Sequence, residues 1–210
     1  MKRKVFGLLV LSAAIAALCV VGSRARGGDG DDYQPVIWVR VGDAAPAVAV
    51  SDDKGRLWRS QDYNRGRLLV YYFYLGDFMK NPIKQARAYS DEYGQFAAEG
   101  AVVVGVSGDT VETHQRFKET YKLRQTLLAD PKGVVTHDFG VPLSGGGTLR
   151  IDGPDGKELA FERGCTPAQW TFVVGPDGKV LYKAMNTDPE TDSRRALEFV
   201  RKHNHQRQGR

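Results

Sequence analysis

The chain has 210 residues, a formal charge of +5 and an ordinary apolar content of 41%, which suits one domain of average size with additional segments. Nine of the 30 Lys and Arg residues lie near the two ends, whereas 24 of the 25 acids lie between residues 31 and 200, so the middle of the chain is slightly acidic. Nucleic-acid binding requires basic residues gathered on one face, and this distribution argues against a nucleic-acid-binding class.

The first 25 residues predict a secretory signal or an N-terminal membrane anchor. Three cations, Lys2, Arg3 and Lys4, precede an apolar run from Val5 to Val21, and small residues follow where a signal peptidase cuts. The run of 17 residues is at the lower edge of what spans a bilayer, so cleavage and anchoring both stay open. We expect a polar linker over residues 26–40 and a periplasmic or otherwise extracytoplasmic location for the remainder.

The segments after the linker predict strands that alternate with helices. Arg67–Tyr74 and Ala101–Ser107 are nearly continuous apolar runs, typical of strands buried on both faces. This order predicts an α/β domain over residues 41–204, with a mixed central sheet flanked by helices, compatible with a thioredoxin-like fold. We expect short strands at 36–60 and 126–130, helices at 82–98, 111–123, 133–139 and 188–203, hairpins at 148–163 and 171–184, and a basic tail at 205–210.

The strand-to-helix junction after Tyr74 is a place where many folds put their chemistry. It reads "LGDFMKNP" and contains no Cys, Ser, His or Thr. Asn81 is a favoured N-cap residue, and Pro82 suits the first helical position because its missing N–H would have no partner there. The junction therefore has good chemistry for starting a helix and offers no reactive group.

Several motifs, in order, resemble a known family. "VGDAAP" (Val41–Pro46), "GVSGDTVETHQRFKETYKLRQTLLADPKG" (Gly105–Gly133), "FGV" (Phe139–Val141) and "TFVVGPDGKVLY" (Thr171–Tyr182) resemble a peroxiredoxin of the alkyl hydroperoxide reductase and thiol-specific antioxidant type, nearest the bacterioferritin-comigratory group. The resemblance implies a thioredoxin-like fold and a peroxidatic thiolate at the helix N-terminus, where the helix dipole and an arginine lower the thiol pKa.

The residues that the resemblance assigns to peroxide reduction are all replaced. An ungapped alignment from Phe73 puts Met79 and Lys80 at the Thr and Pro positions of the family motif, and Pro82 at the peroxidatic cysteine. Arg87 stands at the resolving cysteine, and Gln169 stands at the family arginine. The resemblance therefore implies the ancestry of a thioredoxin-dependent peroxidase, while the residues predict a site that has lost its nucleophile.

Cys165 is the remaining candidate for thiol chemistry, because Cys19 lies inside the N-terminal apolar run. A reactive thiol needs surroundings that lower its pKa, and Arg163 is a sequence candidate for that role. Otherwise Cys165 is an unpaired cysteine of a loop or core. By the resemblance, His114 is a packed histidine of its helix. The sequence predicts no cofactor, and its histidines give no specific metal pattern.

Three functions remain open from the sequence. The first is an exported peroxiredoxin-like protein that has lost thiol peroxidase activity and serves as a binding or structural module. The second is an antioxidant thiol-dependent oxidoreductase or peroxidase that uses Cys165. The third is an enzyme of unrelated chemistry in the segment 142–169, which is longer than the family core requires. The partner would be a protein or a small ligand, and a homodimer stays open.

Overall fold

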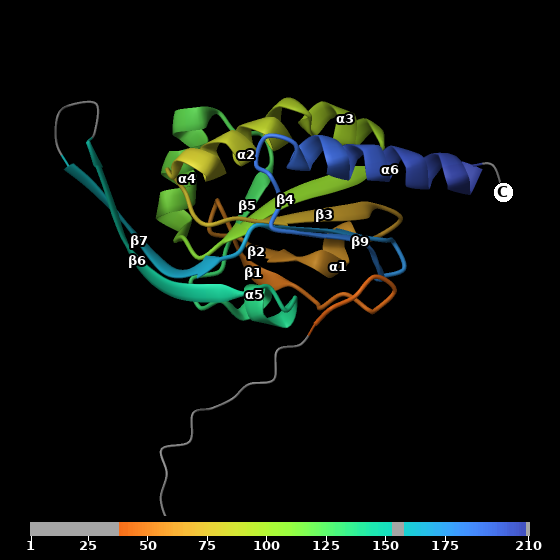
Figure 1. The fold of residues 1–210 in the computed structure, drawn as a ribbon, viewed down its shortest axis with the longest axis horizontal. Coiled ribbons are helices and arrows are strands. Elements are labelled where there is room, and N and C mark those ends of the chain that lie inside the picture. Colours follow the sequence, from red (N-terminus) through yellow and green to blue (C-terminus); the bar gives the residue numbers. More distant parts are fainter. Residues whose placement is uncertain (1–37, 153–157, 209–210) are drawn as a thin grey trace, which may run out of the picture. The chain divides into compact units, whose positions relative to one another are not determined.

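A seven-stranded sheet forms the centre of the computed structural model, which describes residues 38–152 and 158–208 (Figure 1). The strand order is β2-β1-β5-β4-β3-β8-β9, and a separate two-stranded sheet pairs β6 with β7. The strands are β1 (Ala49–Asp52), β2 (Leu57–Arg59), β3 (Leu68–Phe73), β4 (Ala101–Ser107), β5 (Thr126–Ala129), β6 (Leu143–Asp152), β7 (Glu158–Pro167), β8 (Trp170–Val174) and β9 (Val180–Met185). The helices are α1 (Ser60–Tyr63), α2 (Lys80–Asp91), α3 (Tyr93–Ala98), α4 (Val111–Tyr121), α5 (Val134–Asp138) and α6 (Asp192–Gln208).

The two strands predicted from continuous apolar runs, β3 and β4, lie in the middle of the sheet. β3 pairs in parallel with β4 and antiparallel with β8, and every side chain of β3 is buried. β4 continues in parallel to β5, while β1 and β9 run antiparallel to their neighbours. The prediction of a mixed central sheet is therefore confirmed.

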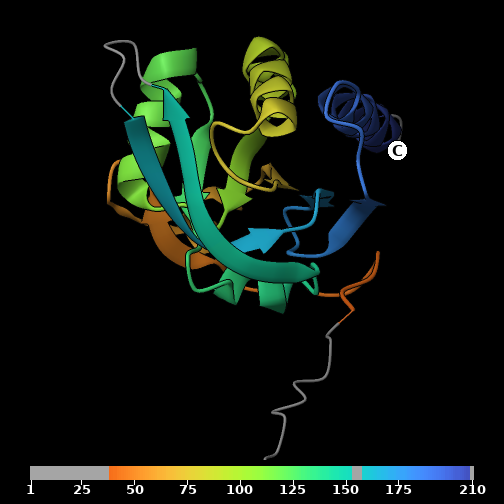
Figure 2. The ribbon, with the colours of Figure 1, turned by 60° about the vertical axis from the view of Figure 1, so that its left-hand side comes forward.

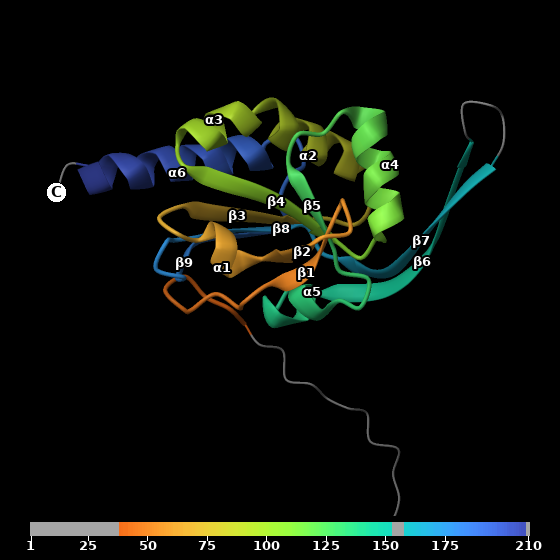
Figure 3. The same cartoon turned by 180° about the vertical axis from the view of Figure 1, so that it is seen from behind.

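Helices cover both faces of the sheet. Figures 1 and 3 show α2, α3, α4 and α6 on one face, with α1 and α5 on the other. The first layer buries Tyr89, Phe96 and Phe117 against the sheet, and the second buries Phe139 beneath Tyr71. The sheet is thus enclosed as expected for a thioredoxin-like arrangement of βαβ units.

Two helices differ most from their predicted bounds. The single helix expected at 82–98 is divided at Glu92 (φ −89°, ψ 0°), which ends α2 and precedes α3. Gly94, a poor helix former, lies just after this break. The closing helix starts at Asp192 rather than Asp188, because the carbonyl of Asp188 accepts bonds from Thr191 and Asp192 in a preceding turn. α6 then continues to Gln208, through most of the predicted basic tail.

The inserted hairpin is longer than predicted. β6 and β7, here called the ribbon, pair from Leu143↔Pro167 to Asp152↔Glu158. The Gly-rich segment "SGGGT" (Ser144–Thr148) predicts a flexible lead into the hairpin, and that prediction is wrong because the glycines at 145–147 lie within β6. Backbone pairing with β7 holds these glycines extended, which single-sequence propensity does not reveal. Figure 2 shows the ribbon crossing one end of the central sheet.

Some predictions fall outside the described residues. They are the signal or anchor at 1–25, most of the linker and the turn at 153–157. Among the residues that the structure describes, no helix is long and apolar enough to cross a membrane.

Candidate functional site

The junction between β3 and α2 is where the family resemblance puts the reactive thiol. α2 starts at Lys80, with Met79 as its N-cap in an extended conformation, so the prediction of Asn81 as N-cap is wrong. Pro82 occupies the third helical position, which tolerates proline because the first N–H groups of a helix have no intrahelical partner. The first helical bond runs from the N–H of Ile83 to the carbonyl of Met79, at 3.0 Å.

The five substituted positions do not form one cluster of side chains. Met79 is half-buried and Pro82 is buried, whereas Lys80 and Arg87 are exposed on α2. Gln169, at the position of the family arginine, donates from Nε2 to the side-chain oxygen of Gln85 at 3.2 Å. A neutral amide replaces a cation there, so this side chain supplies no charge to stabilise a thiolate or a peroxide.

The ribbon supplies the residues that cover the junction. Phe161 of β7 is buried and stacks on Phe78, with ring centroids 4.4 Å apart and planes at 15°. The guanidinium of Arg163 reaches the N-cap of α2, with Nη1 3.3 Å from the sulfur of Met79. Phe78 has a φ of 59°, a conformation that costs a bulky residue about 1–3 kcal/mol and needs support from its neighbours. The stacked aromatic rings give that support.

Gly76 makes room for Arg163. A Cβ added at Gly76 would lie 1.7 Å from Nη1 of Arg163, and the φ of 151° at Gly76 is one that residues with side chains rarely adopt. Sequence reasoning did not connect these two residues, because they are far apart in the chain. The glycine in "LGDFM" was the available sign that something packs closely against this loop.

Glycines also set the crossing of the ribbon over the sheet. The N–H of Gly164 donates to the carbonyl of Gly108 at 2.9 Å. A Cβ at Gly164 would lie 1.9 Å from the carbonyl oxygen of Pro131, and one at Gly108 would lie 2.0 Å from that of Cys165. The backbone of β7 is therefore in direct contact with the loops that follow β4 and β5. A side chain at Gly108 or Gly164 would clash and force the ribbon away from these loops.

A buried polar network lies beneath the junction. Asp77 accepts a hydrogen bond from the hydroxyl of Tyr74 at 2.7 Å, and its other oxygen lies 2.7 Å from Nδ1 of His114. Asp109 accepts from the backbone N–H of Asp77 at 2.8 Å and from the hydroxyl of Ser107 at 2.7 Å. The network joins the ends of β3 and β4 to α4 and fixes the loop that carries Phe78.

Burial and charge shift the titration of this network. Burial, with the charge of Asp77, raises the pKa of Asp109 to about 6. Burial disfavours a charged imidazole, but the carboxylates of Asp77 and Asp109 outweigh it and raise the pKa of His114 above its ordinary value. The pair of His114 and Asp77 is therefore a fully buried ion pair that joins α4 to the loop after β3.

Cys165 lies on β7, two residues after Arg163. Its side chain is buried, and its Sγ donates to the carbonyl of Asp130 at 3.3 Å. Burial, together with the charges of Asp130 and Asp109, raises the pKa of the thiol to about 11, despite the opposing charge of Arg163. These surroundings oppose the thiolate that a peroxidase needs.

A second buried network attaches α6 to the rest of the fold. One oxygen of Asp192 accepts from Gln85 at 2.9 Å, from Tyr89 at 2.9 Å and from Thr171 at 2.8 Å. Burial raises the pKa of Asp192, although these three donors oppose the shift. Gln169 extends this network through Gln85, so the residue that the resemblance aligns with the family arginine takes part in the packing of α2, β8 and α6.

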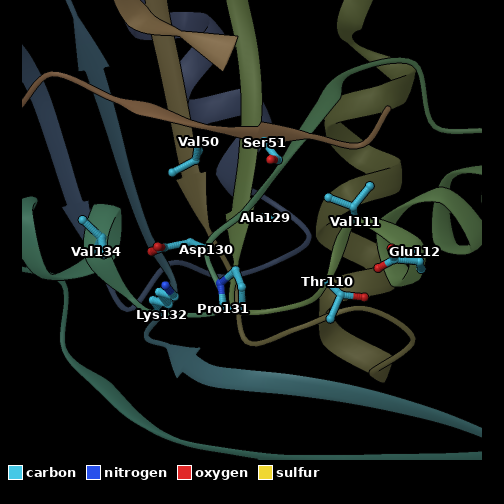
Figure 4. Close-up of a pocket in the computed structure, with 10 residues that line it drawn as sticks. All are labelled: Val50, Ser51, Thr110, Val111, Glu112, Ala129, Asp130, Pro131, Lys132 and Val134. Atoms are coloured by element: carbon cyan, nitrogen blue, oxygen red, sulfur yellow. The ribbon is translucent and has the colours of Figure 1, made fainter. Parts of the chain in front are cut away.

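An open pocket of about 370 Å³ lies at the carboxyl end of β5 and the start of α4 (Figure 4). Its lining includes the apolar side chains of Val50, Val111 and Val134, while Glu112 lies at its edge. It contains none of the five substituted positions and no cysteine. Within the described ranges, no group of three or more His, Cys, Asp or Glu residues could hold a metal ion.

Comparison with known proteins agrees with this geometry. The model of the AhpC/TSA family matches residues 41–183. Peroxiredoxin Q of the chloroplast of Suaeda salsa is 39% identical over 163 residues, which is 77% of this chain and 68% of that protein. A putative chloroplastic peroxiredoxin Q of Oryza sativa subsp. indica is 36% identical over 144 residues, and the match spans 69% of this chain but only 58% of the rice protein.

A solved structure is similar in fold as well. The crystal structure of the peroxidoxin BcpB from Mycobacterium tuberculosis superposes with a TM-score of 0.65 at 25% identity, covering 78% of this chain and 97% of that one. The fold and the matched residues thus agree on the family. The chain belongs to the AhpC/TSA family of peroxiredoxins.

Proposed function

We propose that this chain is an exported peroxiredoxin-like protein that has lost thiol peroxidase activity and serves as a binding or structural module. One observation carries the proposal: Pro82 stands where the family resemblance puts the reactive cysteine, and Arg163 and Phe161 of the ribbon pack over the same loop. Removing a nucleophile from an enzyme costs several orders of magnitude in rate. The packing of the ribbon gives the junction a structural role in place of the chemical one.

The alternative is an antioxidant oxidoreductase or peroxidase that uses Cys165. Such an enzyme would need the thiolate of Cys165 to attack a peroxide oxygen, to become a sulfenic acid and to release water or an alcohol. A thiol whose pKa is about 11 is almost entirely protonated near neutral pH, and this one is also buried. We therefore rank the alternative second.

Export is the remaining element of the proposal. It rests on the basic residues at 2–4 and the apolar run after them, which are typical of a signal peptide or an uncleaved anchor. A reporter enzyme fused after Gly28 should be active only where it is exported. Cytoplasmic activity of that fusion would contradict the proposal.

The test of lost activity is peroxide consumption by the purified protein with a thiol reductant. We expect turnover at the background rate for the wild type and for Cys165→Ser, because neither has a nucleophile at the start of α2. Turnover that Cys165→Ser abolishes would move the alternative to first place. Rapid turnover that survives Cys165→Ser would instead support a chemistry in the 142–169 segment.

The expected partner is a protein or a small ligand, and the ribbon is its expected site. The ribbon is longer than the family core requires, and the residues of β6 are exposed except Leu149 and Ile151, which are half-buried. Loops and hairpins added to a fixed scaffold commonly carry new functions. A homodimer is compatible with this proposal, and sedimentation equilibrium of the full chain would measure it.

A further inference from the structure

One apolar face lies along the edge strand β9, where Met185 pairs with Trp170 of β8. It consists of Trp38, Arg40, Val41, Lys183 and Met185, which line an open hollow of about 490 Å³ beside β9. We call it the Trp38 face. Trp38, Val41 and Met185 are 53%, 60% and 56% exposed, and they make up half of the six large apolar side chains that are exposed in the described part of the chain. Exposed apolar residues gathered in this way mark an interaction site more often than scattered ones do.

Cations are part of the same face. The ammonium group of Lys183 lies 4.5 Å from the ring centre of Trp170 and 5.5 Å from that of Trp38, and it donates to the carbonyl of Val39 at 2.8 Å. It therefore holds the indole of Trp38 at the surface. Arg40 is exposed and lines the same hollow. Asp43 is the acidic residue that interacts electrostatically with Lys183.

The position of this face along the chain restricts its partner. Trp38 is the first described residue, and only 16 residues separate it from Val21, the end of the N-terminal apolar run. Such a segment extends at most about 55 Å. If the run is held in a bilayer, the Trp38 face stays within that distance of the lipid surface, at an effective concentration on the order of millimolar.

We infer that the Trp38 face docks on the anionic lipid surface in which the N-terminal segment is anchored. Trp is enriched at membrane interfaces because its ring is apolar and its N–H is polar, and Arg and Lys nearby bind lipid phosphates. The face offers an exposed Trp, two further apolar side chains and two cations together. This inference rests on the anchored form of the proposed export and goes beyond it by naming the surface that meets the membrane.

Tryptophan quenching tests the inference in the full chain. The protein is reconstituted in vesicles of equal parts phosphatidylglycerol and phosphatidylcholine whose acyl chains carry bromine, which quenches Trp on contact. Trp38 should be quenched, and Trp38→Phe should remove the effect, because Trp58 and Trp170 are only 2% and 3% exposed. The quenched fraction gives a docking equilibrium constant.

A matched pair of variants tests the role of charge. Arg40→Gln should lower the docking constant about fivefold, since a cation at an anionic surface contributes about 1 kcal/mol. Arg59→Gln should leave it unchanged, because Arg59 is an exposed arginine of β2, at the opposite edge of the sheet. Equal effects of the two variants would overturn the inference.

Flotation of the same vesicles separates this inference from the proposal on which it rests. Protein that floats with the vesicles while Trp38 stays unquenched is anchored without docking, which overturns the inference and leaves the export proposal standing. Protein that does not float at all contradicts the anchored form, and the inference fails with it. Shielding of Trp38 from aqueous acrylamide in vesicle-free, concentrated protein would assign the face to a second copy of the chain instead.

Discussion

At the scale of single residues, the chemistry of this chain is decided at Pro82. The family resemblance puts a thiolate there, held at a helix N-terminus with an arginine nearby. Here the helix starts without a nucleophile, Gln169 replaces the arginine and bonds to Gln85, and Met79 contacts the guanidinium of Arg163. Met79 and Gln169 each make a packing or hydrogen-bonding contact, which is consistent with the proposed loss of the reactive group.

Cys165 should behave as an inert thiol. Because burial and neighbouring carboxylates raise its pKa to about 11, alkylation of the folded protein should be slow near neutral pH and should still accelerate above about pH 9. An unperturbed thiol would be half ionised near pH 8.5. Alkylation rates measured across this pH range check the prediction. A rate that reaches its plateau below about pH 7 would instead show a stabilised thiolate.

His114 should make stability fall as the pH rises. Its folded pKa is raised, so its contribution is complete below the unfolded value of about 6.5 and is lost as the pH passes through the higher folded value. Asp109, raised to about 6, acts in the same direction at lower pH: its contribution is complete below about 3.8 and is lost as the pH rises through about 6. Urea unfolding at several pH values measures both effects.

The variant His114→Gln tests this pH dependence of stability, with His137→Gln as its control. His114→Gln leaves Asp77 buried without its cation, so we expect a loss of about 3–5 kcal/mol and a free energy of unfolding that no longer falls above about pH 6.5. His137 is an exposed histidine of α5, and its replacement should change neither quantity. An alkaline decline that His114→Gln leaves intact would show that other groups cause it.

At the scale of elements, the ribbon depends on the glycines at its crossing. Gly164→Ala should destabilise the protein by about 1–3 kcal/mol, as overpacking does, because the new Cβ would lie 1.9 Å from the carbonyl oxygen of Pro131. Gly147→Ala is the matched control in the same ribbon, since a Cβ there meets nothing within 4 Å. Thermal unfolding compares the two variants, and equal melting temperatures would contradict the close crossing.

The sequence predicted some elements well and others poorly, for physical reasons. β3 and β4 were predictable because continuous apolar runs require burial on both faces. The start of α2 was missed by two residues, because Asn81 and Pro82 both suit a helix start and local chemistry does not fix the exact boundary. The glycines at 145–147 suggested a loop, whereas pairing with β7 makes them part of a strand.

For the candidate site, the sequence predicted only which family residues are missing. Alignment with the family motif was enough to place Pro82 at the cysteine position and Gln169 at the arginine position. The contact of Arg163 with Gly76, and the burial of Cys165, depend on where the ribbon crosses the sheet. No local pattern contains that information, because the contacting residues lie in separate elements.

At the scale of the whole molecule, we propose different roles for the ribbon and for the Trp38 face. The ribbon and its contacts cover the carboxyl ends of the parallel strands, where this fold commonly carries chemistry (Figure 2). The Trp38 face lies along β9, at one edge of the sheet, next to the point where the N-terminal segment joins. In the anchored form that we propose, the Trp38 face meets the lipid and the ribbon carries the site for a partner.

The most direct test of the central claim is the mass of the reduced, folded protein after exposure to hydrogen peroxide. Any thiol peroxidase must first transfer one oxygen to sulfur. We predict no rapid one-oxygen adduct on Cys165, with peptide mapping used to separate slow oxidation of Met79 from oxidation of the thiol. A stoichiometric adduct on Cys165 that forms within seconds, and that Cys165→Ser abolishes, would contradict the account.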